Sequence, residues 1–127
     1  MESPTTLVNL SNHASDTWSG KQRAAALLLG RETLDFPFPD IRPDLDIGEV
    51  KAISARTVSA VIALRPSAVL VQGEFTLTYC LIRAFLSLSV PCYASCGPRI
   101  SQERNYANGS AIRTSHFEFV QFRRYEE

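Results

Sequence analysis

Four short polar segments hold the side chains of this sequence that can do chemistry. They are "SNHASD", "PFPDIRP", "QGEF" and "SCGPR", which begin at residues 11, 37, 72 and 95. Together they supply an imidazole for proton transfer, a guanidinium for a bidentate contact with phosphate or carboxylate, and amide, hydroxyl and carboxylate groups for hydrogen bonding. These groups can act together only if the fold brings the four segments to one place.

His13 is the residue of the first segment that helix capping does not explain. Ser15 and Asp16 are interpreted as caps of the helix that follows. An imidazole in such a loop can serve as a general base, a phosphate ligand or a structural hydrogen-bonding group. Ser11 and Asn12 stand next to it and are predicted to bind the same ligand.

Gln72, Gly73 and Glu74 follow the apolar run "AVLVQ" at the point where a buried strand should end. Gly73 removes the side chain where the backbone turns into a helix, and it allows a ligand to approach the amides of the helix N-terminus. Glu74 falls where the helix dipole favours a carboxylate by about 0.3–1 kcal/mol, so capping and ligand contact are both open for it. Gln72 has no capping duty, and we expect its amide to be exposed and to face a ligand.

Arg99 follows Gly97 and Pro98 in the loop after the fourth predicted strand, where it is either a phosphate-binding or a solvated arginine. The residues after it have a positive excess and several aromatics. Aromatics in a hairpin are expected to be core, and stacking on nucleic-acid bases is the alternative. The second histidine, His116, is interpreted as a structural residue at the start of the final strand.

Apolar runs and capping signals predict alternating strands and helices. Ser19 with Gln22, and Asp46 with Glu49, form capping-box patterns. "NGS" at 108–110 is a turn signal between "ISQERNYA" and "IRTSHFEFVQF", which predicts a C-terminal β-hairpin. The expected strands are 5–10, 32–36, 68–72 and 91–95, and the expected helices follow Ser19, follow Asp46 and cover 75–88.

This alternation predicts an α/β fold, a small Rossmann-like domain with a mainly parallel sheet and helices on both faces. The length of 127 residues fits one domain over residues 1–127. Ligands on such sheets bind beyond the carboxyl ends of the strands, near the point where strand order reverses. The four polar segments are expected to meet at that edge.

Composition removes several classes of function. The net charge is zero, so affinity for nucleic acid needs a local patch, and DNA is not an expected partner. No signal peptide or membrane span is evident, so we expect a cytoplasmic protein. The three cysteines lack the spacing of a zinc site and are expected to be buried free thiols. Neither G-x-G-x-x-G nor a Walker A motif is present, so no cofactor and no metal are predicted.

The segments "LVNLSNH", "VLVQGEF", "CYASCGPR" and "FEFVQFRRY" resemble small CRISPR-associated Rossmann-fold (CARF-like) proteins of type III systems, a group that includes ring nucleases. In that group the fourth strand ends in an Ala-Thr-Thr-x-Arg type of motif. Here Ser95 matches the hydroxyl, Cys96 departs from the pattern, and Gly97 adds one residue before Arg99. This difference from the motif weakens the prediction of catalysis more than the prediction of ligand binding.

The resemblance implies that the protein binds and cleaves a cyclic oligoadenylate, most commonly the tetramer, by metal-independent attack of a ribose 2′-hydroxyl. It also implies a homodimer with the ligand on the two-fold axis. Two alternatives stay open: a sensor or sponge that binds without cleavage, and a small-molecule enzyme on a Rossmann-like fold. The predicted catalytic residues are His13, Gln72 and Arg99, and the predicted ligand-binding residues are Ser11, Asn12, Gly73, Glu74 and Ser95.

Overall fold

The computed structural model describes residues 3–127, and its main sheet has the strand order β2-β1-β3-β4-β7. The first four strands in this order are parallel, and β7 runs antiparallel to β4. The predicted Rossmann-like α/β class is confirmed. The strands are β1 (Thr6–Ser11), β2 (Glu32–Pro37), β3 (Pro66–Gln72), β4 (Cys92–Cys96) and β7 (Gln121–Arg124).

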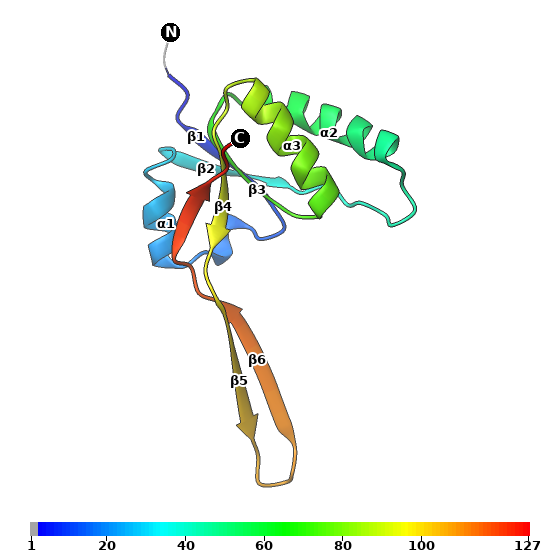
Figure 1. Cartoon of the computed structure of the whole chain (residues 1–127). Helices are drawn as coiled ribbons and strands as arrows, with labels where there is room; N and C mark the ends of the chain where they lie inside the picture. The colour runs from blue at the N-terminus through cyan, green and yellow to red at the C-terminus, as the bar shows by residue number, and fades with distance from the viewer. Residues whose placement is uncertain (1–2) are drawn as a thin grey trace.

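Helices cover both faces of this sheet, as Figure 1 shows: α1 (Gly20–Ala26) lies on one face, and α2 (Ile47–Ile62) and α3 (Phe75–Ser87) lie side by side on the other. Both predicted caps are confirmed, because the side chains of Ser19 and Asp46 accept hydrogen bonds from backbone N–H groups three residues later.

The capping role expected of Ser15 and Asp16 is wrong. These residues lie in a short 3-10 turn (Ser15–Thr17), which has Ala14 at its N-cap position and no side-chain capping bond.

Alternate residues of the central strands pack against opposite helical layers. Val8 and Val69 belong to the core under α2 and α3, whereas Leu7 and Leu70 belong to a smaller core on the α1 face. Consecutive apolar residues are needed because both faces are covered. Trp18 closes the smaller core, with its ring centroid 6.1 Å from that of Phe122 in β7.

The C-terminal hairpin is confirmed, and it stands apart from the main sheet. It consists of β5 (Arg99–Asn105) and β6 (Ala111–Phe117), which pair only with each other. Nearly all its residues are exposed, and Figure 1 shows it projecting away from the body. We call residues 99–117 the arm.

Two expectations about this region are wrong. The segment "IRTSHFEFVQF" is two strands, β6 and β7, and not one. His116 therefore lies near the end of β6, outside the final strand. Tyr106 and Phe117 are exposed rather than core, although Phe119, between the two strands, is buried.

The cysteines agree only partly with the expectation that they are buried free thiols. All three thiols are free, but Cys92 is buried and Cys80 and Cys96 are half-buried. Within residues 3–127, every helix is too short or too polar to cross a membrane.

Candidate functional site

A cavity of about 440 Å³ lies at the carboxyl ends of β1, β3 and β4, on the α1 face, and reaches the base of the arm. We call it the strand-end pocket. It brings together five of the eight predicted site residues. Its lining consists of Ser11, His13, Thr17, Trp18, Ser19, Gln22, Leu70, Gln72, Ser95, Arg99, His116, Phe117 and Phe119.

The order of the strands explains why this pocket forms where it does. β1 lies between β2 and β3 in the sheet. The chain therefore passes from β1 to β2 on one side of it, and then crosses back over β1 to form β3 on the other side. Crossovers on opposite faces leave a crevice at this reversal. Ser11 and Gln72, the last residues of the two central strands, are neighbours in register there.

A buried amide fixes the loop that holds His13. Asn9 is 1% exposed, and its Nδ2 donates to the His13 carbonyl oxygen at 2.8 Å and to Asp35 Oδ1 at 2.9 Å. Its Oδ1 accepts a hydrogen bond from Ser11 Oγ at 2.7 Å. The imidazole of His13 makes no hydrogen bond to any other residue in the described range, so it is available to a ligand.

Asp35 is a site-building residue that sequence reasoning missed. It stands opposite Asn9 in the β1–β2 register, and its carboxylate accepts hydrogen bonds from the backbone N–H and the Oγ of Ser15 at 3.1 Å. Asp35 is one of two carboxylates in the strand "ETLDF", so residue type alone does not single it out. The role of Asp35 becomes evident only when β1 and β2 pair, because its partner Asn9 lies 26 residues earlier in the chain.

The structure corrects the prediction that the Gln72 amide is exposed and uncommitted. Gln72 is half-buried, its Oε1 accepts from the Ser95 N–H at 2.8 Å, and its Nε2 donates to the Ser95 carbonyl oxygen at 3.2 Å. The amide thus extends the β3–β4 ladder beyond the last backbone pair, Leu70 with Tyr93. Gln22 Nε2 donates to Ser95 Oγ at 3.2 Å, which holds α1 against the same strand end.

Three of the predicted ligand-binding residues do not line the strand-end pocket. Asn12 borders a separate cavity of about 230 Å³ beside Asp35. A Cβ atom on Gly73 would lie 2.5 Å from the ring of Phe38, so packing of that buried ring explains the glycine. Glu74 is the N-cap of α3.

Hydrogen bonding to the capping carboxylate changes its acidity. The backbone N–H groups of Leu77 and Thr76 donate to it at 2.9 and 3.0 Å and lower the pKa of Glu74 from its ordinary value. Desolvation acts in the opposite direction, and the hydroxyl of Thr76 adds a further hydrogen bond that lowers the pKa of Glu74. Glu74 therefore acts as a cap, which is one of the two roles that the sequence left open.

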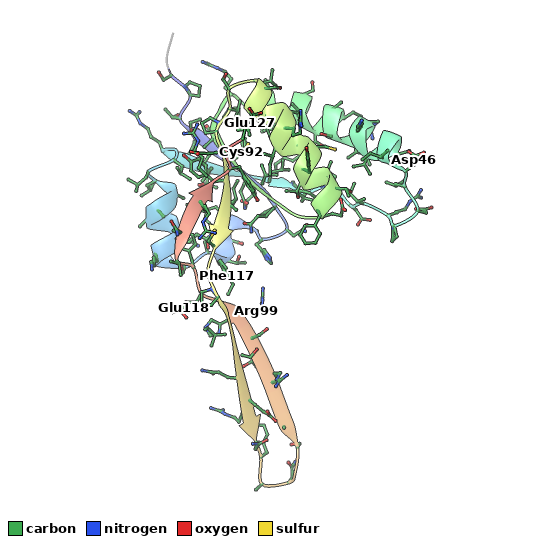
Figure 2. All side chains as sticks on the ribbon, in the orientation of Figure 1. Asp46, Cys92, Arg99, Phe117, Glu118 and Glu127 are labelled. Carbon is green, nitrogen blue, oxygen red and sulfur yellow. The ribbon has the colours of Figure 1, made fainter. Side chains whose placement is uncertain are left out.

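The base of the arm places Arg99 at the pocket. Backbone bonds from Glu118 N to Pro98 O at 2.9 Å and from Val120 N to Cys96 O at 2.8 Å join the arm to β4 and β7. A Cβ atom on Gly97 would overlap the Glu118 carbonyl oxygen, so only glycine permits this approach. Figure 2 shows Arg99 and Phe117 together at this junction.

Arg99 and His116 are the cationic or ionisable groups of the arm that border the pocket. The guanidinium of Arg99 forms no ion pair with any described residue. His116 is exposed and is opposite Ile100 in register, one position from the Arg99–Phe117 pair. Its imidazole has no hydrogen bond within residues 3–127, so no contact supports the expected structural role.

The comparison with known families covers both the sheet and the arm. Residues 5–123 match the family described as the uncharacterized protein MJ1673 family. The chain belongs to this family. All residues that line the strand-end pocket fall inside the matched region. No curated protein and no solved structure matches the chain.

The described residues also limit where a metal ion can bind. Among residues 3–127, no three His, Cys, Asp or Glu side chains are grouped so that they can hold a metal ion. The polar side chains that line the strand-end pocket carry imidazole, guanidinium, hydroxyl and carboxamide groups.

Proposed function

We propose that the protein binds a cyclic oligoadenylate in the strand-end pocket and cleaves it by metal-independent attack of a ribose 2′-hydroxyl on the adjacent phosphorus. One observation carries the proposal: His13 from the loop after β1 and Arg99 from the arm border the same cavity. Neither side chain has another partner among the described residues. The proposal also rests on the resemblance of the sequence segments to CARF-like proteins.

The size and lining of the pocket suit one nucleotide unit. Cavities that hold small ligands have volumes of about 300–1,000 Å³, and this one has about 440 Å³. Phe117, which is exposed, offers an aromatic ring against which an adenine can stack, and Arg99 can make a bidentate contact with a phosphate. The remaining nucleotides of a ring would lie along the open side of the pocket and the base of the arm.

The local charge also favours an anionic ligand. The arm contains three arginines and one glutamate in a chain whose net charge is zero. Of these three arginines Arg99 is the one that borders the strand-end pocket, so its guanidinium is the local positive charge that a polyanionic ligand would meet there.

The proposed cleavage forms one bond and breaks one. The 2′-oxygen attacks phosphorus, its proton passes to the His13 imidazole, and the bond from phosphorus to the 5′-oxygen breaks. The leaving 5′-oxygen takes a proton from water in the open pocket, so the products are a 2′,3′-cyclic phosphate and a 5′-hydroxyl. Arg99 stabilises the added negative charge of the phosphorane. Gln72 acts indirectly, by fixing the Ser95 backbone at the end of β4.

The test is to incubate the purified protein with cyclic tri-, tetra- and hexa-adenylate in EDTA and to separate the products by chromatography. We expect a linear product ending in a 2′,3′-cyclic phosphate, and we expect His13→Ala to reduce the rate at least about a hundredfold. Arg104→Ala, a charge change on the arm away from the pocket, is the control and should retain the wild-type rate.

Other results would change the proposal in defined ways. Saturable binding without any product would establish the sensor or sponge and remove the catalytic part. No binding of any ring would contradict the proposed function as a whole. A homodimer, which the resemblance implies, is part of the proposal.

A further inference from the structure

His116 borders the strand-end pocket, although the proposed cleavage gives it no role. It lies near the end of β6, and its side chain is exposed. Its neighbour across the arm is Ile100, whose side chain has no group that could bond to an imidazole. Packing and hydrogen bonding within the described residues therefore do not explain a histidine at this position.

The strand-end pocket contains two side chains that can exchange a proton near neutral pH. The ionisable residues among the described residues that line it are His13, Arg99 and His116. An arginine keeps its proton in proteins. An imidazole has an ordinary pKa of about 6.5, so it can both accept and donate a proton near pH 7. Because His13 accepts the 2′ proton in the proposed cleavage, His116 is the imidazole that remains to act as a donor.

The two histidines come from segments on opposite sides of the strand-end pocket. His13 follows β1, whereas His116 belongs to the arm, which joins β4 to β7. β3 lies between β1 and β4, so the two strand ends are separated by two strand spacings, or about 10 Å. An in-line displacement needs its proton acceptor and its proton donor on opposite sides of phosphorus, each about 3 Å from an oxygen. The separation of the two segments fits this requirement.

The base of the arm places His116 beside the group that can bind phosphate. Arg99 and Phe117 are cross-strand neighbours, and His116 precedes Phe117 in β6. A phosphate that the Arg99 guanidinium holds is therefore close to His116 as well. A nearby anion attracts the protonated form of an imidazole, which is the form that can donate a proton.

The leaving 5′-oxygen needs a better acid than water alone. Bulk water has a pKa of about 15.7, so a water that gives up a proton without help leaves a hydroxide in the pocket. An imidazolium is a far stronger acid near neutral pH. A positioned general acid of this kind typically accelerates a reaction by about 10²–10⁴-fold.

We propose that the His116 imidazolium supplies the proton that the leaving 5′-oxygen takes up. The imidazolium donates a proton to a water in the open pocket while this water donates one to the 5′-oxygen, so the bond from phosphorus to that oxygen breaks without forming a hydroxide. After cleavage His13 is protonated and His116 is neutral, and exchange with solvent restores both. This assignment rests on the proposed function.

A ring with sulfur as the leaving atom separates proton donation from any other role of His116. A thiol has an ordinary pKa of about 8.5, so a 5′-thiolate can leave without being protonated, whereas a 5′-oxygen cannot. The probes are the ring that the wild-type protein cleaves fastest, which we expect to be cyclic tetra-adenylate, and its analogue with sulfur in place of each bridging 5′-oxygen. Both are incubated in EDTA, and the products are separated by chromatography.

We expect His116→Gln to lower kcat for the oxygen ring at least about a hundredfold, with KM within about threefold of wild type. The same variant should cleave the sulfur ring within about threefold of the wild-type rate. His13→Ala should slow both rings, because it acts on the attacking oxygen. Thr114→Ala is the matched control, since Thr114 is exposed on β6 two residues from His116 and does not border the strand-end pocket. Circular dichroism checks that the variants fold.

Three outcomes would overturn the inference. A His116→Gln protein that cleaves the oxygen ring like wild type would show that His116 donates no proton, and the proposed function would stand. Equal slowing of both rings by His116→Gln would assign His116 to binding or structure, and the proposed function would again stand. If the wild-type protein cleaves no ring, the proposed cleavage fails and this inference fails with it.

Discussion

Replacing Gln72 with alanine tests whether this amide is part of the sheet. The change removes two hydrogen bonds to Ser95, at 2.8 and 3.2 Å, where the backbone ladder between β3 and β4 has ended. Each such bond contributes about 0.5–1.5 kcal/mol to stability. Gln72 and Ser95 are both half-buried, so water can replace part of the lost hydrogen bonding. We therefore expect a loss of about 1.5 kcal/mol in the free energy of unfolding. For a chain of this length that is about 5–7 °C in melting temperature.

Urea unfolding followed by circular dichroism measures this loss. Gln72→Glu keeps the size of the side chain but turns an oxygen toward the Ser95 carbonyl oxygen, so it should be destabilised at neutral pH at least as much as the alanine variant. Gln102→Ala is the control, because Gln102 is exposed on the arm and its side chain bonds no described residue. A Gln72→Ala protein as stable as the Gln102→Ala protein would refute the reasoning.

Three further substitutions test how the site is built. Glu74→Ala should lower the free energy of unfolding by about 1 kcal/mol at neutral pH. Folding lowers the pKa of this carboxyl from 4.5, so the stability difference between variant and wild type should disappear as the pH falls through the folded-state pKa. A stability difference that does not change with pH would contradict the capping role. Gly97→Ala should destabilise the protein by about 1–3 kcal/mol, because the added Cβ would overlap the Glu118 carbonyl oxygen. Gly20→Ala is the control, since a Cβ atom there meets nothing within 4 Å. Equal urea midpoints for the two variants would argue against the close approach at Gly97. Asn9→Leu should cost about 2–4 kcal/mol, because it removes the three hydrogen bonds that this buried amide makes to His13, Asp35 and Ser11. A neutral result in the same assay would show that the buried network does not stabilise the loop.

The elements that local sequence determines were predicted well. The caps at Ser19 and Asp46 and the apolar run that forms β3 depend on residues a few positions apart, so they can be read without the fold. The meeting of the strand ends at one edge of the sheet could also be predicted from the sequence, because parallel strands joined by helices bring their carboxyl ends to the same edge. His13 and Arg99 therefore lie at the same pocket as predicted.

The features that were missed depend on contacts between distant segments. The role of Gln72 is decided by Ser95, 23 residues away, and the need for Gly73 is decided by the ring of Phe38. The separation of the arm from β7 depends on the backbone crossing at Gly97 and Glu118. Residue type gives no sign of such pairings when only one sequence is considered.

Calorimetric titration with cyclic tetra-adenylate tests the central claim most directly, because it asks whether the strand-end pocket binds a phosphodiester ring. We predict saturable binding by the wild-type protein and a loss of about 1.5–3 kcal/mol, or roughly ten- to a hundredfold in affinity, for Arg99→Ala with no change in melting temperature. Arg104→Ala should bind within about twofold of wild type. Equal affinities for wild type and Arg99→Ala, or no binding by the wild-type protein, would contradict the account.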